Sequence, residues 1–254
     1  MSLPPSITAK ELLLKACEVG NLDLARVLLA TGADISWTDD MDWAGLHYAA
    51  YGGHSDLLDL LLEQPRVDVN LMTKYCQTPL MLACNTVGRQ GIVQKLLQVQ
   101  GLHLNDQDTW GQTALHGAVR RGYVQEFRGK PGLNWNVMDG DGETPLLMAA
   151  RLGLADSLQV ILAHLDDIAI NNNGQNVSWL AVRNSEEWNS LRCVQLLSDD
   201  QRVDWNTRDD AGDTPLLYCL KNNKFEFSWI LLKNPRVDHH VQDREGKYPE
   251  TIAR

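Results

Sequence analysis

The hydrophobic positions of the chain recur with the spacing of amphipathic helices. In the segment SDLLDLLLEQ, the side chains of Leu57, Leu58, Leu61 and Leu62 share one face of a helix, because residues three and four apart lie on the same side. Shorter helical segments that end in a pair of small residues, such as Ala149–Ala150, precede segments of this kind. The pattern therefore predicts repeated pairs of short helices that pack closely at the small residues.

A polar block marks where the first helix of each pair begins. In DGETPLLMAA, the Thr144 hydroxyl can accept a hydrogen bond from the first helical turn, and Pro145 suits a position whose N–H is not needed. The Asp-x-x-Gly sequence before it favours a tight turn. Copies of the block recur at intervals of 31 to 38 residues. The Thr of TPL or its expected counterpart stands at Glu11, Ala44, Thr78, Thr113, Thr144, Asn176, Thr214 and Tyr248.

These TPLHxA-like blocks and the period near 33 residues resemble the ankyrin-repeat family. The resemblance implies an all-α ankyrin-repeat α-solenoid, in which helix–turn–helix units are joined by β-hairpin-like loops. We expect a tail over residues 1–8 and a single array of about eight units over residues 9–254. Its first and last units depart from the pattern and are expected to act as caps, which shield the core from water.

Two internal repeats are also irregular. Gly122 and Asn136 are separated by 14 positions, whereas Gly53 and Asn70 are separated by 17. The second helix of repeat four should therefore be about one turn shorter than that of repeat two. Repeat six lacks TPL, and we expect a long connection over residues 183–193. We predict that repeats four and six are the least stable joints of the stack.

The acidic stretch MDGDGET has the appearance of a calcium-binding loop. Asp139, Asp141 and Glu143 alternate with glycine, but the Gly and Glu that an EF-hand needs at its sixth and twelfth positions are Thr144 and Ala150. We interpret the stretch as a hairpin turn. No catalytic or metal-binding motif is found elsewhere, so we predict a protein that is not an enzyme, with no catalytic residues, no metal and no cofactor.

Several residue types with chemical potential are expected to be structural. His47 and His116 occupy the His position of the TPLH block and should hydrogen-bond within their own hairpins. Trp135 and Trp205 are expected to pack beneath hairpins. The five cysteines contain no CxxC pair, which favours a reducing compartment, and the cysteines in helix interiors are expected to fill the core.

Charge and hydropathy limit the classes of partner and the cellular locations that are expected. The net charge of −10 disfavours nucleic acid, because neutralising phosphates needs a broad basic surface. No apolar segment approaches the ~20 residues needed to cross a bilayer, and the start of the chain lacks a secretory signal. We expect a monomeric cytoplasmic protein without membrane insertion, and the sequence leaves a nuclear location open.

Exposed residues at the hairpin tips and after each small pair are candidates for binding a protein or peptide. The resemblance to the ankyrin-repeat family implies that these positions line a concave groove. Aromatic and Arg side chains are favoured at binding hot spots. The candidate partner-binding residues are Trp43, Tyr51, Tyr75, Trp110, Arg120, Arg121, Arg151, Arg183 and Lys221. The basic members favour an acidic or phosphorylated partner.

Two alternatives stay open for these features. The cations could instead neutralise their own hairpins, Arg151 with Asp141 or Glu143 and Lys221 with Asp210 or Asp213. The resemblance also implies that the chain could be the substrate of an asparaginyl hydroxylase, which modifies the Asn of VDVN-like loops. The candidate hydroxylation sites are Asn70, Asn105, Asn136 and Asn206. An enzyme within repeat six is a third hypothesis, and it lacks a nucleophile–base pair.

Overall fold

The computed structural model describes residues 8–168, 170, 176–183 and 187–252, without the side chains of residues 187–189. They form two compact units, the first ending at Asn134 and the second beginning at Trp135. Within the described residues the regular elements are helices and no strand is present, as the predicted fold class requires. The prediction that residues 9–254 form a single array is not tested by this division and stays a prediction.

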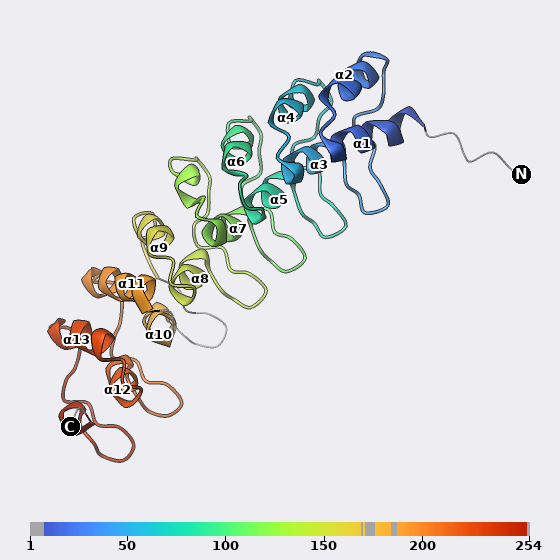
Figure 1. Cartoon of the computed structure of the whole chain (residues 1–254). Helices are drawn as coiled ribbons and strands as arrows, with labels where there is room; N and C mark the ends of the chain where they lie inside the picture. Colours follow the sequence, from blue (N-terminus) through green and yellow to red (C-terminus); the bar gives the residue numbers. More distant parts are fainter. Residues whose placement is uncertain (1–7, 169, 171–175, 184–186, 253–254) are drawn as a thin grey trace, which may run out of the picture. The chain divides into compact units, whose positions relative to one another are not determined.

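The first unit consists of two layers of short helices, with the hairpin loops along one edge (Figure 1). The inner layer comprises α1 (Ala9–Val19), α3 (Gly45–Gly52), α5 (Pro79–Asn85) and α7 (Ala114–Arg121). The outer layer comprises α2 (Leu22–Ala30), α4 (Ser55–Leu62), α6 (Gln90–Leu96) and the 3-10 helix η1 (Val124–Phe127). The four-residue η1 stands where α4 has eight residues, which confirms the predicted shortening in repeat four.

The second unit repeats this arrangement (Figure 1). Its inner helices are α8 (Pro145–Arg151), α10 (Val177–Arg183), α12 (Pro215–Lys221) and the short α14 (Pro249–Ile252). Its outer helices are α9 (Ala155–Leu162), α11 (Glu187–Asp199) and α13 (Phe225–Lys233). The prediction of a long connection over residues 183–193 was wrong for residues 187–193, because these residues belong to α11. Ser190, Cys193 and Val194 are buried there at helical spacing.

The TPL blocks begin the inner helices as predicted. The Thr78, Thr144 and Thr214 hydroxyls accept hydrogen bonds from backbone N–H groups three residues on, over 3.3, 3.3 and 3.4 Å. A proline follows each as the first helical residue. In repeat one the capping residue is Thr8 rather than the expected counterpart Glu11, whose carboxylate instead accepts from the Thr8 backbone N–H over 2.7 Å. This reciprocal pair extends α1 by about one turn.

The two TPLH-type histidines are structural, as expected. His47 Nδ1 accepts from the Ala44 N–H over 3.0 Å, and Nε2 lies 2.9 Å from the Leu71 carbonyl oxygen of the next repeat. His116 Nδ1 accepts from the Thr113 N–H over 3.1 Å. Burial lowers the pKa of His47, so the ring is held in its neutral form. Each ring therefore fixes the start of its own helix.

The remaining residues expected in the core are buried. Trp135 and Trp205 are 9% and 1% exposed. All five cysteines are thiols, and four of them are buried. Burial raises the pKa of Cys17, Cys193 and Cys219 to about 12, which keeps these thiols protonated and unreactive.

Loop asparagines join each repeat to the next one within a unit. The Asn70 amide donates to the Gly101 carbonyl over 2.8 Å and accepts from the His103 N–H over 2.8 Å. Asn105 makes the same two bonds to the loop at Gly132 and Asn134, over 2.7 and 2.8 Å. Asn206 does so in the second unit, with Arg236 and Asp238. The loop of the repeat that follows Asn136 includes residues outside the described ones.

Candidate partner-binding surface

The hairpin turns are built on aspartate side chains that fold back on the backbone. Asp139 Oδ1 accepts from the N–H groups of Asp141 and Glu143 over 3.0 and 2.9 Å. These bonds satisfy the carboxylate inside its own turn, as in an Asx turn, and support the interpretation of MDGDGET as turn chemistry. Asp39 holds the first hairpin in the same way, accepting from Met41 and Trp43.

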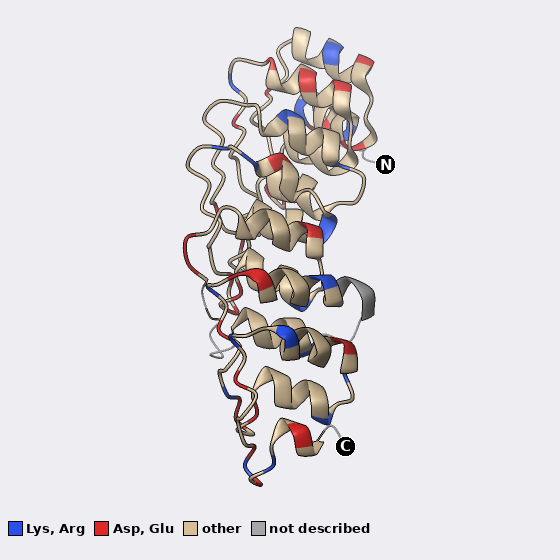
Figure 2. Cartoon of the chain, turned by 90° about the vertical axis from the view of Figure 1, so that its left-hand side faces the viewer, with Lys and Arg blue, Asp and Glu red and all other residues tan. Residues whose placement is uncertain are grey.

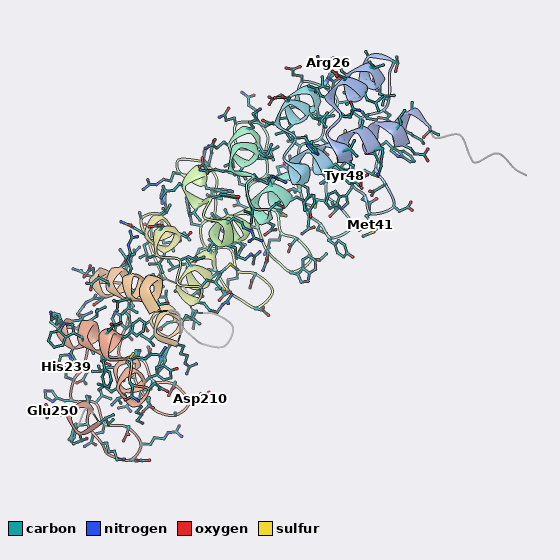
Figure 3. All side chains as sticks on the ribbon, viewed as in Figure 1. Arg26, Met41, Tyr48, Asp210, His239 and Glu250 are labelled. Atoms are coloured by element: carbon teal, nitrogen blue, oxygen red, sulfur yellow. The ribbon has the colours of Figure 1, made fainter. Side chains whose placement is uncertain are left out.

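Two neighbouring hollows lie beside the first hairpin of the N-terminal unit. The first, of about 870 Å³, is lined by Glu11, Leu14, Lys15, Glu18, Trp37, Thr38, Asp39, Asp40, Met41, Asp42, Tyr48 and Lys74. The second, of about 750 Å³, is lined by Glu18, Asp39, Met41, Trp43, Tyr48, Tyr51, Gly52, His54, Gln77, Leu82, Asn85 and Thr86. Glu18, Asp39, Met41 and Tyr48 line both. Figure 3 shows Met41 and Tyr48 on the side of the unit away from Arg26 of α2.

Acidic groups outnumber basic ones in the first hollow. It contains five carboxylates and two ammonium groups, and Lys15 already pairs with Glu18 over 2.7 Å. Among the described residues, neither Asp40 nor Asp42 forms an ion pair, and both are exposed. Acidic and basic positions occur together on the loops toward the C-terminus (Figure 2). This hollow is therefore a place where negative charge is not compensated by the chain itself.

Aromatic side chains form the apolar wall of the second hollow. The Trp43 ring centroid lies 5.0 Å from that of Tyr48 and 5.6 Å from that of Tyr51, which is 52% exposed. The Tyr48 hydroxyl donates to Asp39 Oδ2 over 2.5 Å. Burial and this hydrogen bond raise the pKa of Tyr48. Burial acts to raise the pKa of Asp39, but the hydrogen bonds from Tyr48, Trp43 and Met41 outweigh it and lower that pKa.

The other predicted aromatic residues lie further along the same unit. Tyr75 and Trp110, at the next two hairpin tips, stack with ring centroids 5.7 Å apart and are 46% and 57% exposed. Their hairpins are joined by the Thr109 N–H, which donates to the Tyr75 carbonyl over 3.1 Å. The structure thus places Trp43 with Tyr51, and Tyr75 with Trp110, as two aromatic pairs.

The two predicted arginines of α7 are held by neutral groups. Arg120 Nη2 donates to Asn85 Oδ1 over 3.0 Å and to Gln112 Oε1 over 2.5 Å. Arg121 Nε donates to the Asn85 carbonyl over 2.9 Å and remains exposed. Both arginines therefore lie against α5 of the preceding repeat.

The predicted cations of the second unit are paired with carboxylates. Arg183 lies 3.1 Å from Asp209, and its guanidinium also lies 4.8 Å from the Trp179 ring centroid. Lys221 lies 2.7 Å from Asp213, one of the two carboxylates expected for it, and 2.9 Å from Asp243.

Arg151 makes the most specific of these pairs. Its guanidinium donates twice to Glu143, over 2.6 and 2.7 Å, which is one of the two local pairings left open by the sequence. In the second unit the local pairing therefore exists for Arg151 and Lys221, whereas Arg183 pairs with Asp209 in the hairpin of the following repeat. Whether these residues also bind a partner stays a prediction.

The described part of the chain contains neither a cluster of metal-ligating side chains nor a membrane-spanning helix. No group of three or more His, Cys, Asp or Glu side chains there could hold a metal ion. None of the helices within that part has both the length and the apolar character that a membrane crossing requires.

Comparison with known protein families accounts for the fold. A family model described as ankyrin repeats in three copies matches residues 12–108, 46–128, 80–164 and 115–209. Together these matches extend from residue 12 to residue 209 of the 254 residues. The chain is an ankyrin-repeat protein. Ankyrin repeats are in general protein–protein interaction modules.

Curated proteins similar to this ankyrin-repeat protein share parts of the array with it. Ankyrin repeat domain-containing protein 53 of Homo sapiens is 35% identical over 108 residues, 41% of this chain and 20% of that protein. Notch-regulated ankyrin repeat-containing protein of Xenopus tropicalis is 43% identical over 47 residues, 18% of this chain and 41% of that protein. Alpha-latrotoxin-Lg1a of Latrodectus geometricus is 34% identical over 88 residues, 34% of this chain and 6% of the toxin. The chain thus spans less than half the length of each relative.

Sequence reasoning missed the acidic hollow of this ankyrin-repeat protein. The run DDMD over residues 39–42 carried the signal, since three of its four residues are acidic. The inner-helix position Glu18 belongs to the preceding repeat, and only the folded unit brings it to the same hollow as Asp39 and Tyr48.

Proposed function

We propose that this ankyrin-repeat protein is a non-catalytic interaction module whose N-terminal unit binds a basic segment of a partner protein in the two hollows beside α1 and α3. One observation carries the proposal: Asp40 and Asp42, exposed carboxylates that pair with no cation of the described residues, lie beside the aromatic wall of Trp43, Tyr48 and Tyr51. The family's general role in protein–protein interaction supports the non-catalytic part.

The chemistry of the hollows suits Lys and Arg side chains. Carboxylates form charge-assisted hydrogen bonds with ammonium and guanidinium groups, and aromatic faces attract cations. The chain itself provides an example, since the Lys10 ammonium lies 3.4 Å from the centroid of the Trp37 ring, which lines the first hollow. A basic partner segment would meet both kinds of group within one surface.

The competing proposal is an acidic or phosphorylated partner bound by the basic residues. In the N-terminal unit it would use Arg120 and Arg121, which donate hydrogen bonds to amide and carbonyl oxygens. In the second unit an acidic ligand would have to displace carboxylates from Arg151, Arg183 and Lys221. That competition favours the basic partner.

A random peptide library panned against the full chain tests both proposals. We expect the selected peptides to be enriched in Lys and Arg relative to the library. The enrichment should disappear with the variant Asp40→Asn/Asp42→Asn and persist with the control Asp210→Asn/Glu250→Gln, which removes the same charge from the second unit. Asn tolerates the positive φ of 59° at residue 42. Peptides enriched in Asp and Glu, and lost with Arg120→Gln/Arg121→Gln, would support the acidic partner instead. No enrichment would reject both.

Loop asparagine hydroxylation is the second candidate function. It is supported by the recurrence of one loop geometry, because Asn70, Asn105 and Asn206 make the same pair of inter-repeat bonds. An enzyme that accepts one of these loops meets the same backbone at the others. Peptide mapping of cellular protein should then show additions of one oxygen at these residues and at Asn136, whereas unmodified loops would contradict the idea.

We also propose a cytoplasmic location, with the nucleus as the alternative. All five cysteines are thiols, as is usual in reducing compartments. Fluorescence microscopy of the tagged chain distinguishes the two.

A further inference from the structure

The outer face of α13 exposes an apolar row that no other part of its repeat covers. Phe225, Trp229 and Leu232 are 63%, 62% and 40% exposed, and they share one side of the helix at spacings of four and three residues. Beside this row, between α11 and α13, lies a hollow of about 760 Å³. Its lining residues are Leu191, Arg192, Gln195, Phe225, Glu226, Trp229 and Ile230.

The position that Trp229 occupies is polar in four of the other outer helices. The residue four places after the first helical residue is Trp229 in α13. Its counterparts in α2, α4, α6 and α9 are Arg26, Asp59, Gln94 and Gln159. Figure 3 labels the first of these, Arg26. A contiguous apolar patch of this kind is a mark of an interaction surface, because water contact with it is unfavourable.

The charged residues beside the apolar row suit a second copy of the same helix. Glu226, Ile230 and Lys233 form the adjacent row, with an acidic residue at one end and a basic residue at the other. Among the described residues Glu226 forms no ion pair. Lys233 lies over Trp229, with its ammonium 4.6 Å from a ring centroid. Such a row is complementary to a copy of itself that runs in the opposite direction.

A two-fold axis near Trp229 brings both rows into register. An antiparallel copy of the helix then places Glu226 opposite Lys233 of the second copy, and Phe225 opposite Leu232 of the second copy. Trp229 meets its own counterpart near the axis. The other rim charge, Arg192, already pairs with Asp156 over 2.7 Å, so the rim does not favour a partner of either net charge.

We propose that the outer face of α13 (Phe225, Trp229 and Leu232, with Glu226, Ile230 and Lys233) is a homodimer interface in which α13 packs antiparallel against α13 of a second copy. This dimer takes the place of the monomer expected from the sequence. None of these residues lines either hollow of the N-terminal unit, so the proposal stands independently of the function proposed above.

Sedimentation velocity of the full chain over a concentration series tests the dimer. We expect the wild type to approach twice the monomer mass as its concentration rises. Trp229→Glu should weaken association by at least about tenfold, because it puts two carboxylates near the axis. Glu226→Lys should also weaken it, by placing two lysines opposite each other. The exchange Glu226→Lys/Lys233→Glu should restore the wild-type association, since it recreates both pairs with reversed sign.

The matched control is Gln159→Glu, the equivalent position on α9, which should leave association unchanged. Thermal melting of each variant shows whether it is folded. Because Trp229 and Glu226 are exposed, we expect all variants to fold. A wild type that stays monomeric at every concentration overturns the proposal. So does a dimer that is insensitive to Trp229→Glu, or a charge exchange that fails to restore association.

Discussion

Arg151 binds Glu143 through two parallel hydrogen bonds, with Nε 2.6 Å from Oε1 and Nη2 2.7 Å from Oε2. The hydrogen bonds that Arg151 donates to Glu143 raise the pKa of Arg151. The Glu143 side chain is only 11% exposed, whereas that of Arg151 is 47% exposed. The pair therefore ties the end of α8 to the hairpin that precedes it, and it holds a carboxylate that has lost most of its contact with water.

We predict that Arg151→Met lowers the free energy of unfolding by about 1–2 kcal/mol, because it removes the cation from a nearly buried carboxylate. The control is Arg192→Met. Its partner Asp156 is 83% exposed, so the loss should be within about 0.5 kcal/mol. Urea denaturation of both variants measures the difference. Equal losses would show that burial of Glu143 contributes nothing.

A second prediction concerns pH and the buried His47. Its pKa in the folded chain lies below the ordinary value of 6.5, because burial disfavours the charged ring. As pH falls through 6.5, the unfolded chain takes up a proton that the folded chain resists, so stability declines. The contribution is fully present above that pH.

Urea denaturation at about pH 7.5 and about pH 5.5 measures this decline on either side of the ordinary histidine pKa. The His47→Gln variant should lose less stability between the two values than the wild type does. The exposed His240, changed to Gln, serves as the control and should keep the wild-type decline. An unchanged decline in His47→Gln would assign the effect to other groups.

The third prediction concerns the asparagines that join successive repeats. Asn105→Ala removes one bond to the Gly132 carbonyl and one from the Asn134 N–H. We expect a loss of about 1–2 kcal/mol in the free energy of unfolding. Asn222→Ala removes a bond within its own helix and should cost less. Thermal and urea denaturation compare the two, and a larger loss for Asn222→Ala would contradict the inter-repeat role.

The fourth prediction concerns the irregular repeat four. Its outer helix η1 has four residues, so its amides belong to a single short turn with poorer hydrogen bonds than an α-helix has. Hydrogen exchange should be faster over residues 123–134 than over α4. The sequence predicts the same for repeat six. Uniform protection from repeat two to repeat seven would show that neither is a weak joint.

Residues with a fixed local role were predictable from the sequence. Thr144 and Pro145 start α8 as their types require, and the local pairing of Arg151 with Glu143 was one of two alternatives. The segment over residues 187–193 was misjudged as a connection because its helix lacks the TPL and Gly landmarks of the other repeats. The TPL block and the glycines indicate where turns and helix caps lie. They do not indicate a helix that begins without them.

Surfaces formed by several repeats were not predictable in the same way. The segment FEFSWILLK is apolar on nearly every side, so periodicity alone does not show that Trp229 faces outward while Phe227 is buried. The acidic hollow combines Glu18 of one repeat with Asp40 of the next hairpin. Their proximity depends on how the repeats stack, which no single repeat contains.

The inter-repeat asparagines also define how such an array can change its length during evolution. Asn70 and Asn105 make equivalent bonds to the loop that follows each of them. Deleting residues 71–105 would join Asn70 directly to Asp106 and put it in the place of Asn105, with the same carbonyl and N–H ahead of it. Gene duplications or losses with boundaries at these asparagines therefore add or remove a whole repeat while keeping the pair of asparagine bonds at the junction.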